Sequence, residues 1–356
     1  MKSTSINEIK TVRLDDAGDA AVIIDQTLLP GDIRELRLRT PEDFYDAIRS
    51  LAVRGAPAIG IAAAYGVYLA VKHLDTDSYD EFRSAFIAHH EYLNASRPTA
   101  VNLKWALDRM KKVLDKNAGK PIDEIKALLL RESMEIARED EEMCEAIGRH
   151  ALTLLHPGMG VLTHCNAGRL ATGGIGTATA GIYLAERAGY GLRIYCDETR
   201  PLLQGARLTA FELAASGADT TLICDNMASA IMSEGLIDIV FTGCDRVAAN
   251  GDSANKIGTL SVAVNARHYG IPFYICAPSS TIDPACPSGQ NIPIEERSEY
   301  EVTSMWYEKP MAPENIKVRN PAFDVTPANL ITGIITENGI VAAPYEENLS
   351  KLVQEK

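Results

Sequence analysis

The pattern of apolar positions along the chain changes near residue 145. Before this point, apolar residues recur mainly at helical spacing, as in the stretch 122–146. From about Leu155 onward, short continuous apolar runs alternate with segments of helical pattern. We therefore predict an α/β protein of two domains, a smaller and mainly helical one with a short β element over residues 1–145, and one built on a sheet over residues 146–356.

Local signals in the N-terminal part predict a β-hairpin followed by helices. Residues 12–14 and 20–25 alternate apolar and polar positions on either side of the turn-forming residues 15–18. The segment Thr40-Pro-Glu-Asp43 predicts a helix start, because threonine caps, proline suits the first helical position and aspartate closes a capping box. Further helices are predicted over residues 78–96 and 122–146.

Five apolar runs in the C-terminal part are predicted as strands of one sheet. They cover residues 160–165, 192–197, 220–225, 239–245 and 272–277. Helices are predicted between them, over residues 176–188, 204–216 and 254–269. Strands that alternate with helices favour a parallel sheet, and continuous apolar runs suit strands that are covered on both faces.

Each of these runs leads into polar residues. The polar endings are Cys165-Asn166, Asp197-Glu198, Asp225-Asn226, Asp245-Arg246 and Ser279-Ser280. Ligands of open α/β sheets bind outside the carboxyl ends of the strands. A single polar residue at such a place is commonly a helix cap, but five of them at one edge predict a binding site.

Cys165 is the cysteine with the clearest candidate chemistry. It lies between His164 and Asn166 at a predicted strand end, and a glycine-rich segment, residues 171–177, follows it. Backbone N–H groups in such a segment can favour an exposed thiolate, whereas a cysteine in an ordinary core acts as a small hydrophobe. The polar neighbours on both sides favour a reactive Cys165.

The same glycine-rich segment partly matches a dinucleotide-binding fingerprint. Gly174-Ile-Gly176 opens a predicted helix, and Asp197 follows about twenty residues later, as that fingerprint requires. However, Thr179 stands where a third small residue is needed, and the polar stretch 166–173 is too long for the tight first turn. We predict no nicotinamide cofactor.

Residues that could bind or protonate a phosphate ester occur in both parts of the chain. Asp245, at a predicted strand end, can transfer a proton if its surroundings raise its pKa, although it could also pair with the following arginine. Asn255 and Lys256 stand where the next helix is predicted to begin, a place that offers phosphate a cation and backbone donors. Arg54 and Arg97 adjoin small residues at loop–helix junctions, which also suits phosphate. Taken alone, such residues are commonly surface or capping residues.

Composition narrows the class of function. The formal net charge is −13, so nothing indicates the basic face that nucleic acid or a membrane surface requires. The longest apolar stretches, such as residues 59–70, are shorter than the ~20 residues of a membrane-spanning helix. Seven cysteines without a Cys-x-x-Cys pair, and no apparent signal peptide, lead us to expect a cytoplasmic protein with reduced thiols. The histidines show no ligand spacing, and no metal is expected.

Several segments together resemble the methylthioribose-1-phosphate isomerase family. They are residues 54–60 (Arg-Gly-Ala-Pro-Ala-Ile-Gly), 97–102 (Arg-Pro-Thr-Ala-Val-Asn), 163–168, 197–207, 225–227, 243–259, 320–327 and 334–339. The likeness follows the same order along nearly the whole chain. That family shares a Rossmann-like C-terminal domain with the regulatory subunits of the eukaryotic initiation-factor exchange factor, which bind partners and do not catalyse.

The resemblance implies a homodimeric aldose–ketose isomerase of methionine salvage that needs no cofactor. Its small-molecule substrate would be 5-methylthioribose 1-phosphate and its product 5-methylthioribulose 1-phosphate. Asp245 would be the proton donor, and Cys165 would stabilise the transition state. By the same likeness the substrate-binding residues would be Arg54, Gly55, Ala56, Arg97, Gln204, Asn255 and Lys256.

Alternatives stay open at this point. The substrate could instead be 5-deoxyribose 1-phosphate or ribose 1,5-bisphosphate, which differ from the methylthio sugar at C5. A non-catalytic regulatory protein of the same superfamily is a further alternative, although the presence of both Cys165 and Asp245 favours the enzyme. In the enzyme, hydrogen can move from C2 to C1 as a proton, with Cys165 as base, or as a hydride in a dry site.

Overall fold

The computed structural model describes residues 10–97 and 100–354, so Pro98 and Thr99 of the second arginine motif lie outside the described residues. The described chain divides into two compact units. The first runs to Glu145 and includes Gly168–Gly176, and the second consists of Ala146–Ala167 and the chain from Thr177 onward. The glycine-rich segment therefore packs within the first unit, although it follows Cys165 closely in the sequence.

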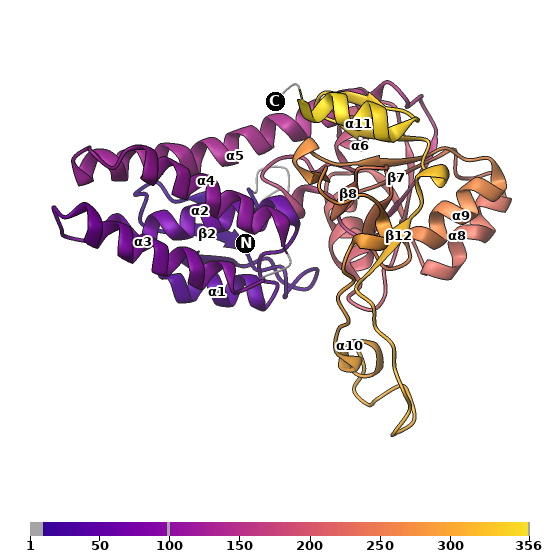
Figure 1. The fold of residues 1–356 in the computed structure, drawn as a ribbon. Helices are drawn as coiled ribbons and strands as arrows, with labels where there is room; N and C mark the ends of the chain where they lie inside the picture. Colours follow the sequence, from indigo (N-terminus) through magenta and orange to yellow (C-terminus); the bar gives the residue numbers. More distant parts are fainter. Residues whose placement is uncertain (1–9, 98–99, 355–356) are drawn as a thin grey trace. The chain divides into compact units, whose positions relative to one another are not determined.

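The first unit combines a small antiparallel sheet with helices (Figure 1). The sheet has the order β1-β2-β3, with β1 (Val12–Leu14), β2 (Ala21–Ile24) and β3 (Glu35–Leu38). The helices are α1 (Pro41–Arg49), α2 (Ala56–Lys72), α3 (Tyr79–Asn94), α4 (Val101–Lys116) and α5 (Ile122–Leu152), the last of which continues into the second unit.

The local predictions for this unit are confirmed. The hairpin forms between β1 and β2 and is closed by a 2.9 Å hydrogen bond from the Asp15 N–H to the Ala20 carbonyl. At the start of α1, the Asp43 N–H donates to Thr40 Oγ1 at 3.2 Å and the Thr40 N–H donates to the Asp43 carboxylate at 2.9 Å. This is the complete predicted capping box. The two other predicted helices form as α3 and α5, and α5 runs on to Leu152.

Helix α2 is the buried centre of the first unit. Almost all of its side chains are shielded from solvent, and small residues let neighbouring helices come close. A Cβ at Gly60 would lie only 3.0 Å from the carbonyl oxygen of Asn102 on α4. The motif at residues 54–60 and the motif that ends at Asn102 therefore meet where α2 packs against α4.

The second unit is built on a seven-stranded sheet with the order β14-β13-β10-β7-β4-β5-β6. The strands are β4 (Gly160–His164), β5 (Arg193–Asp197), β6 (Asp219–Ile223), β7 (Ile239–Thr242), β10 (Phe273–Cys276), β13 (Gly333–Thr336) and β14 (Gly339–Val341). All neighbours are parallel except β13 and β14. The five predicted strands and the Rossmann-like fold are thus confirmed.

Helices accompany this sheet as a parallel topology requires. They are α6 (Ala180–Arg187), α7 (Ala210–Ala215), α8 (Ala228–Ser233), α9 (Thr259–Tyr269) and α11 (Tyr345–Gln354), with a π-helical turn, η3 (Gly205–Thr209), before α7. Short 3-10 turns are η2 (Arg169–Ala171), η4 (Asp225–Met227), η5 (Ser279–Thr281), η6 (Gly289–Asn291) and η7 (Ala328–Leu330). Strands β4, β7 and β13 are buried along their whole length, whereas the edge strand β6 is largely exposed. Among the described helices, none is long and apolar enough to span a membrane.

A second, smaller sheet was not predicted. It has the order β11-β8-β9-β12, with β8 (Arg246–Ala248), β9 (Ser253–Lys256), β11 (Ile282–Asp283) and β12 (Phe323–Thr326). The helix predicted from residue 254 is therefore wrong at its start, because residues 253–256 pair with β8 and β12 and α9 begins only at Thr259. The helix predicted from residue 176 likewise begins later, at Ala180.

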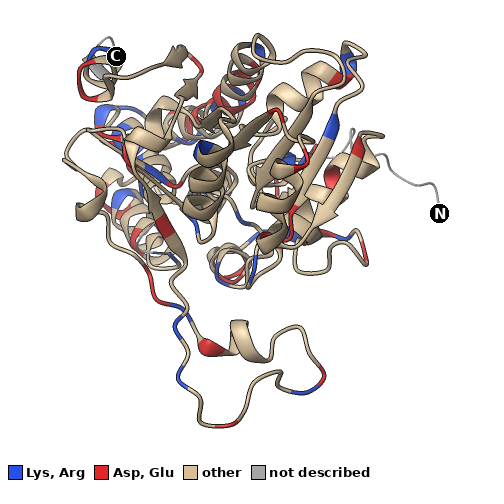
Figure 2. Ribbon diagram, turned by 90° about the vertical axis from the view of Figure 1, so that its right-hand side faces the viewer, with Lys and Arg blue, Asp and Glu red and all other residues tan. Residues whose placement is uncertain are grey.

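An arm extends from the second unit between η6 and β12 and contains α10 (Glu299–Thr303) (Figures 1 and 2). Its two legs pair where the Arg297 N–H donates to the Asn320 carbonyl at 2.9 Å and the Ala322 N–H donates to the Glu295 carbonyl at 2.8 Å. The legs therefore hold each other in an antiparallel arrangement before the chain enters β12.

Candidate functional site

The carboxyl ends of β4, β5 and β6 bring three of the predicted polar endings together. His164 Nδ1 lies 2.9 Å from Asp197 Oδ2 and 3.9 Å from Asp225 Oδ1. The Asp225 carboxylate also accepts hydrogen bonds from the backbone N–H groups of Thr199 and Arg200, both at 2.7 Å. The prediction that these endings lie at one edge is confirmed for the three strands.

Cys165 follows β4 directly and has a constrained backbone. Its φ of 65° lies in the left-handed region, which residues other than glycine rarely adopt. Two hydroxyl groups hold it there: the Cys165 N–H donates to Thr199 Oγ1 at 2.8 Å, and Thr209 Oγ1 donates to the Cys165 carbonyl at 2.6 Å. The residue is only 7% exposed. Backbone conformations of this kind cluster at functional sites, where the surrounding structure maintains them.

Thr209 comes from the π-helical turn η3, which begins after Gln204. Its hydroxyl also accepts a 3.1 Å hydrogen bond from Asn166 Nδ2. Only glycine fits at the first position of this turn, since a Cβ at Gly205 would lie 1.6 Å from the carbonyl oxygen of Asp197. Single π turns occur often at functional sites because they redirect side chains within a helix.

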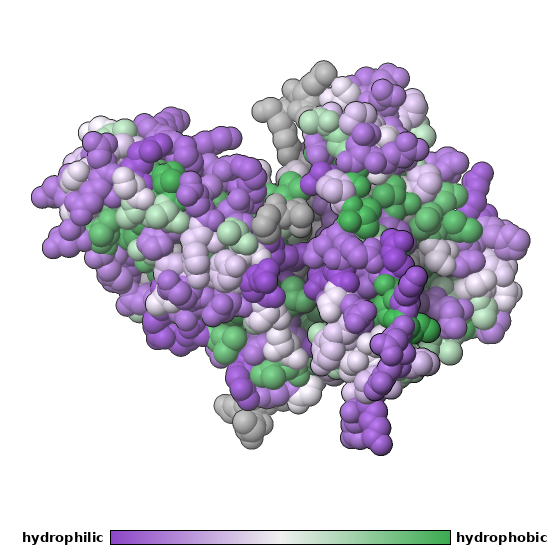
Figure 3. All heavy atoms as spheres, turned by 60° about the horizontal axis from the view of Figure 1, so that its bottom comes forward, coloured by the Kyte–Doolittle hydropathy of each residue, from purple (hydrophilic) through white to green (hydrophobic). Residues whose placement is uncertain are grey.

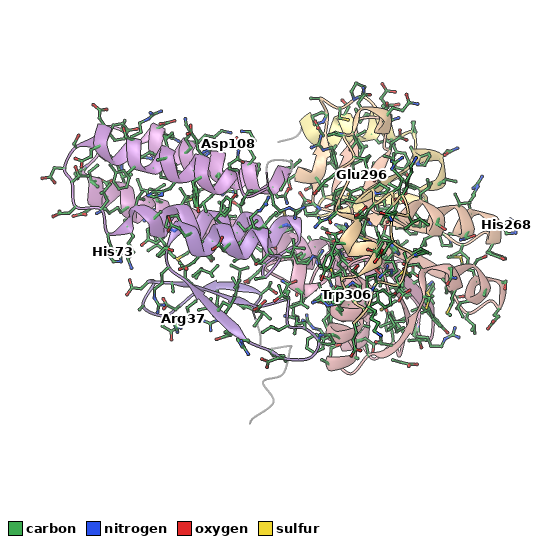
Figure 4. All side chains as sticks on the ribbon, turned by 90° about the horizontal axis from the view of Figure 1, so that it is seen from below. Arg37, His73, Asp108, His268, Glu296 and Trp306 are labelled. Carbon is green, nitrogen blue, oxygen red and sulfur yellow. The ribbon has the colours of Figure 1, made fainter. Side chains whose placement is uncertain are left out.

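Gln204, a predicted substrate-binding residue, is buried beside this turn. Its Oε1 has no hydrogen-bond partner among the residues that the structure describes. A buried acceptor without a partner is costly, and a ligand hydroxyl would satisfy it. The arm holds the preceding chain: Arg200 Nη2 donates to the Val302 carbonyl at 2.7 Å, and Trp306, labelled in Figure 4, donates from Nε1 to the Pro201 carbonyl at 2.6 Å.

Asn255 and Lys256 lie on β9, and not at a helix start as predicted. Their side chains are 5% and 7% exposed. Asn255 Nδ2 donates to Thr259 Oγ1 at 2.9 Å, and Lys256 Nζ lies 4.7 Å from the centroid of the Phe323 ring. A lysine at such a strand end is suited to an anionic ligand such as a phosphate.

Asp245 lies beyond the end of β7, and the prediction that it ends this strand is wrong. Strand β7 stops at Thr242, and Asp245 is an exposed residue in the connection to β8. Its N–H donates to the carbonyl of Ala254 at 2.9 Å, directly before Asn255. Since β4 and β7 are parallel neighbours with His164 opposite Thr242, the chain towards Asp245 leaves the sheet beside Cys165.

The remaining predicted residues belong to the first unit. Arg54 is half-buried and precedes Gly55, which caps the N-terminus of α2 with a φ of 90°. A Cβ at Gly55 would lie 2.5 Å from the Cα of Ala171, so the glycine-rich segment lies directly against it. Ala56 is the first residue of α2. Arg97, also half-buried, accepts a 3.0 Å hydrogen bond at its carbonyl from the N–H of Ala100, which precedes α4.

The glycine at position 55 gives a testable prediction for the first unit. We expect Gly55→Ala to lower the free energy of unfolding by about 1–3 kcal/mol more than Gly18→Ala, because of overpacking against Ala171. Gly18 is the matched control: it shares the positive φ, but a Cβ there would meet nothing nearer than Lys72 Nζ at 3.9 Å. Urea unfolding of both variants measures the difference, and equal losses would show that Ala171 moves aside freely.

His164, Asp197 and Asp225 also place three potential metal-ligand atoms within 4.8 Å of one another. However, His164 Nδ1 faces a carboxylate oxygen and Nε2 faces the carbonyl oxygen of Ile257, each at 2.9 Å. Both ring nitrogens are therefore engaged with the protein. We interpret this cluster as a hydrogen-bond network.

Sequence reasoning missed the two threonines that hold Cys165. Thr199 stands in the segment 197–207 that carries the resemblance, and Thr209 lies just after it, but neither residue ends a strand and no local pattern indicates that its hydroxyl binds Cys165. Thr209 reaches Cys165 only because of the π turn, which has no sequence signature that we could use. His164 and Asp197, in contrast, stand at the ends of parallel neighbouring strands, and this placement could have predicted their contact.

Comparison with known proteins places this geometry in a family. The sequence matches the Initiation factor 2 subunit family over residues 52–343. The methylthioribose-1-phosphate isomerase of Symbiobacterium thermophilum is 61% identical over 349 residues, which are 98% of this chain and 97% of that protein. The 5-deoxyribose 1-phosphate isomerase of Bacillus cereus is 56% identical over 336 residues, 94% of this chain and 96% of that protein.

A solved structure agrees with these matches. The crystal structure of 5-methylthioribose 1-phosphate isomerase from Pyrococcus horikoshii superposes with a TM-score of 0.93 at 42% identity, covering 100% of this chain and 99% of that one. The resemblance predicted from the motifs is confirmed. With the family match covering most of the chain and relatives aligned over nearly its whole length, the protein belongs to the Initiation factor 2 subunit family.

Proposed function

We propose that this protein is an aldose–ketose isomerase of methionine salvage that converts 5-methylthioribose 1-phosphate into 5-methylthioribulose 1-phosphate. The observation that carries the proposal is Cys165, buried and held in a left-handed conformation at the carboxyl end of β4 by two threonine hydroxyls. The names of the relatives support the same activity.

The roles proposed for individual residues follow from the chemistry of a glycosyl phosphate. Its ring cannot open by itself without loss of phosphate, so an acid must protonate the ring oxygen while the C1–O bond to the ring breaks. We assign this proton to Asp245, which is exposed and whose backbone is bonded to β9. Lys256 and Asn255 on β9, with Arg54, Gly55, Ala56 and Arg97, would bind the phosphate, and Gln204 would accept a hydrogen bond from the sugar.

Hydrogen then moves from C2 to C1 by one of two routes. In the first, the Cys165 thiolate removes the C2 proton to give an enol phosphate, and a proton then returns to C1 while the C2 hydroxyl loses its proton to give the ketone. In the second, the C2 hydrogen moves to C1 with its electron pair while the C2 hydroxyl loses its proton to give the ketone. Burial of Cys165 suits the second route, because a dry site protects a hydride from solvent. Reaction in D2O separates them, since only the proton route can place solvent deuterium at C1.

The names of several relatives favour 5-deoxyribose 1-phosphate as a second substrate. Several relatives, including the Bacillus cereus protein, are named 5-deoxyribose 1-phosphate isomerase. This sugar differs from the methylthio sugar only at C5, and the proposed groups act at C1, C2 and the ring oxygen. The same residues would therefore serve both substrates, and the contacts at C5 would set the relative rates.

We further propose a cytoplasmic homodimer without a nucleic-acid partner. Leu222 on the edge strand β6 is 51% exposed, and the arm exposes Trp306, Tyr307 and Met311, side chains that are typical of protein interfaces. The positions of acidic and basic residues are interspersed along the ribbon in Figure 2, and on the face shown in Figure 3 hydrophobic areas lie among hydrophilic ones. Analytical ultracentrifugation at micromolar concentration would test the dimer.

The activity is tested by mixing chelator-treated protein with 5-methylthioribose 1-phosphate and following the ketose by NMR. Parallel reactions contain 5-deoxyribose 1-phosphate and ribose 1,5-bisphosphate. We expect conversion of the methylthio sugar without added metal, and the three rates rank the substituents at C5. Absence of conversion of all three by folded protein would contradict the proposal.

A further inference from the structure

His164 is a fully buried side chain that the proposed reaction does not use. It is the last residue of β4 and precedes Cys165. Its Nε2 lies 2.9 Å from the carbonyl oxygen of Ile257, and its Nδ1 lies 2.9 Å from Asp197 Oδ2. A carbonyl oxygen only accepts hydrogen bonds, so Nε2 carries a hydrogen, and the short contact to Asp197 places a second hydrogen between Nδ1 and the carboxylate.

Carboxylates face this ring from three elements. Asp197 is on β5, Asp225 begins η4 with Oδ1 at 3.9 Å from Nδ1, and Asp324 is on β12. Burial raises the pKa of Asp324, and the charge of His164 opposes part of this rise. Burial lowers the pKa of His164, but the hydrogen bond and charge of Asp197, together with the charge of Asp225, raise the pKa overall. Burial also raises the pKa of Asp197, although its hydrogen bond to His164 opposes the rise. The ring and its carboxylate neighbours therefore form one buried hydrogen-bond network that shares a proton.

The His164 ring contacts the two residues that directly follow Lys256, Ile257 and Gly258. Besides the bond to Ile257, the ring touches Gly258, where a Cβ would lie 2.7 Å from His164 Cε1. Gly258 has a φ of 104° and donates its N–H to Asp324 at 2.8 Å. Ring, carboxylate and glycine together determine where β9 ends and α9 begins.

We propose that His164 is a positioning residue for the isomerisation, which fixes the strand end bearing Asn255 and Lys256 relative to the strand end bearing Cys165. The inference rests on the proposed function, in which these two strand ends bind the phosphate and act on C2. The groups lie on different sheets, β9 in the small one and β4 in the large one. The imidazole at the end of β4 joins them through its hydrogen bond to Ile257, the residue that follows β9, and its other hydrogen bond, to Asp197, holds the ring on the large sheet. A displacement of about 1 Å between reacting groups can cost about 10²-fold in rate, so such a link has a large effect.

Two substitutions at His164 separate its two hydrogen bonds. In His164→Asn the amide nitrogen stands near the Nδ1 position, so the Asp197 contact can persist while the link to Ile257 is lost. In His164→Gln the amide nitrogen reaches the Nε2 position and can keep the link to Ile257. We expect His164→Asn to lower kcat/KM about 10²-fold, mainly through KM, and His164→Gln to lower it clearly less. Equal losses in two folded variants would overturn the proposal.

A pair of glycine variants applies the same test without removing the imidazole. Gly258→Ala pushes a methyl group against the His164 ring, whereas Gly270→Ala, at the other end of α9, has a positive φ but meets no atom within 4 Å. We expect Gly258→Ala to raise KM at least 10-fold and Gly270→Ala to leave kcat and KM within about 2-fold. A Gly258→Ala enzyme with unchanged KM would contradict the positioning role.

Two further readouts distinguish this role from others. A positioning residue leaves the shape of the kcat/KM profile against pH unchanged in His164→Gln, and loss of one limb would instead make His164 an acid–base group. Inorganic phosphate binding, measured by calorimetry on the same variants, does not depend on turnover. Weaker phosphate binding in His164→Asn and Gly258→Ala would support the proposal even if the wild-type protein isomerised none of the sugars, and unchanged binding would overturn it.

Discussion

Replacement of Asp245 by asparagine is expected to lower kcat by about 10²–10⁴-fold, the range that general acid catalysis usually supplies. Asparagine has nearly the same size and shape but cannot protonate the ring oxygen, and without that proton the glycosyl phosphate ring does not open. The backbone N–H of Asp245 donates to the carbonyl of Ala254, and the substitution leaves this bond in place. We therefore expect KM to change by no more than a few-fold, measured from initial rates of ketose formation.

Asp219→Asn is the matched control for this variant. Asp219 is an exposed aspartate at the start of β6, so it lies at the amino edge of the same sheet, opposite to the edge that bears the proposed reaction. The same chemical change there should leave kcat and KM as in the wild type. Normal turnover in a folded Asp245→Asn protein would remove Asp245 from its proposed role, whatever the identity of the sugar.

The large sheet could be predicted from the sequence because its strands are continuous apolar runs. A strand that is buried on both faces has a continuous apolar sequence, and β4, β7 and β10 show this pattern clearly. The start of α1 was equally predictable, since all parts of its capping box are adjacent in the sequence. In each case the information needed was local.

The small sheet shows the limit of local patterns. The sequence of β9, Ser-Ala-Asn-Lys, has neither alternation nor β-branched residues, and it became a strand because β8 and β12 pair with it from both sides. Partners that are distant along the chain decide such a segment, so propensity alone gave a helix. For the same reason Asn255 and Lys256, which we expected at the start of a helix, lie instead at the end of a buried strand.

The reactive residue of the candidate site could be predicted from the sequence, but the hydroxyl groups that hold its backbone could not. Cys165 stood out because polar residues flank it at a strand end, and the structure adds that its backbone is strained and held by Thr199 and Thr209. These contacts join residues that are 34 and 44 positions away in the sequence. Hydroxyl groups that act through backbone atoms at such separations leave no pattern that a single sequence can reveal.

Replacement of Cys165 by serine is expected to lower kcat by about 10²–10⁴-fold while the protein stays folded. Both threonine bonds are made to the backbone of residue 165, so serine keeps them and keeps the left-handed conformation that they maintain. The side chain changes by one atom, but a serine hydroxyl does not ionise near neutral pH, so it cannot supply the anionic base that a thiolate supplies, and oxygen is less polarisable than sulfur beside a developing charge. Initial rates, with circular dichroism to confirm folding, measure the effect.

Cys224→Ser is the appropriate comparison, because Cys224 is a partly exposed cysteine that follows β6 at the same carboxyl edge of the sheet. It makes the same exchange of sulfur for oxygen without touching the chain around residue 165, and we expect wild-type kinetics from it. If Cys165→Ser retained full activity, the strained conformation would have to serve another purpose, such as the placement of Asn166 against Thr209. A loss confined to Cys165→Ser would instead show that the sheet edge holds this thiol in place for the transfer of hydrogen between C2 and C1.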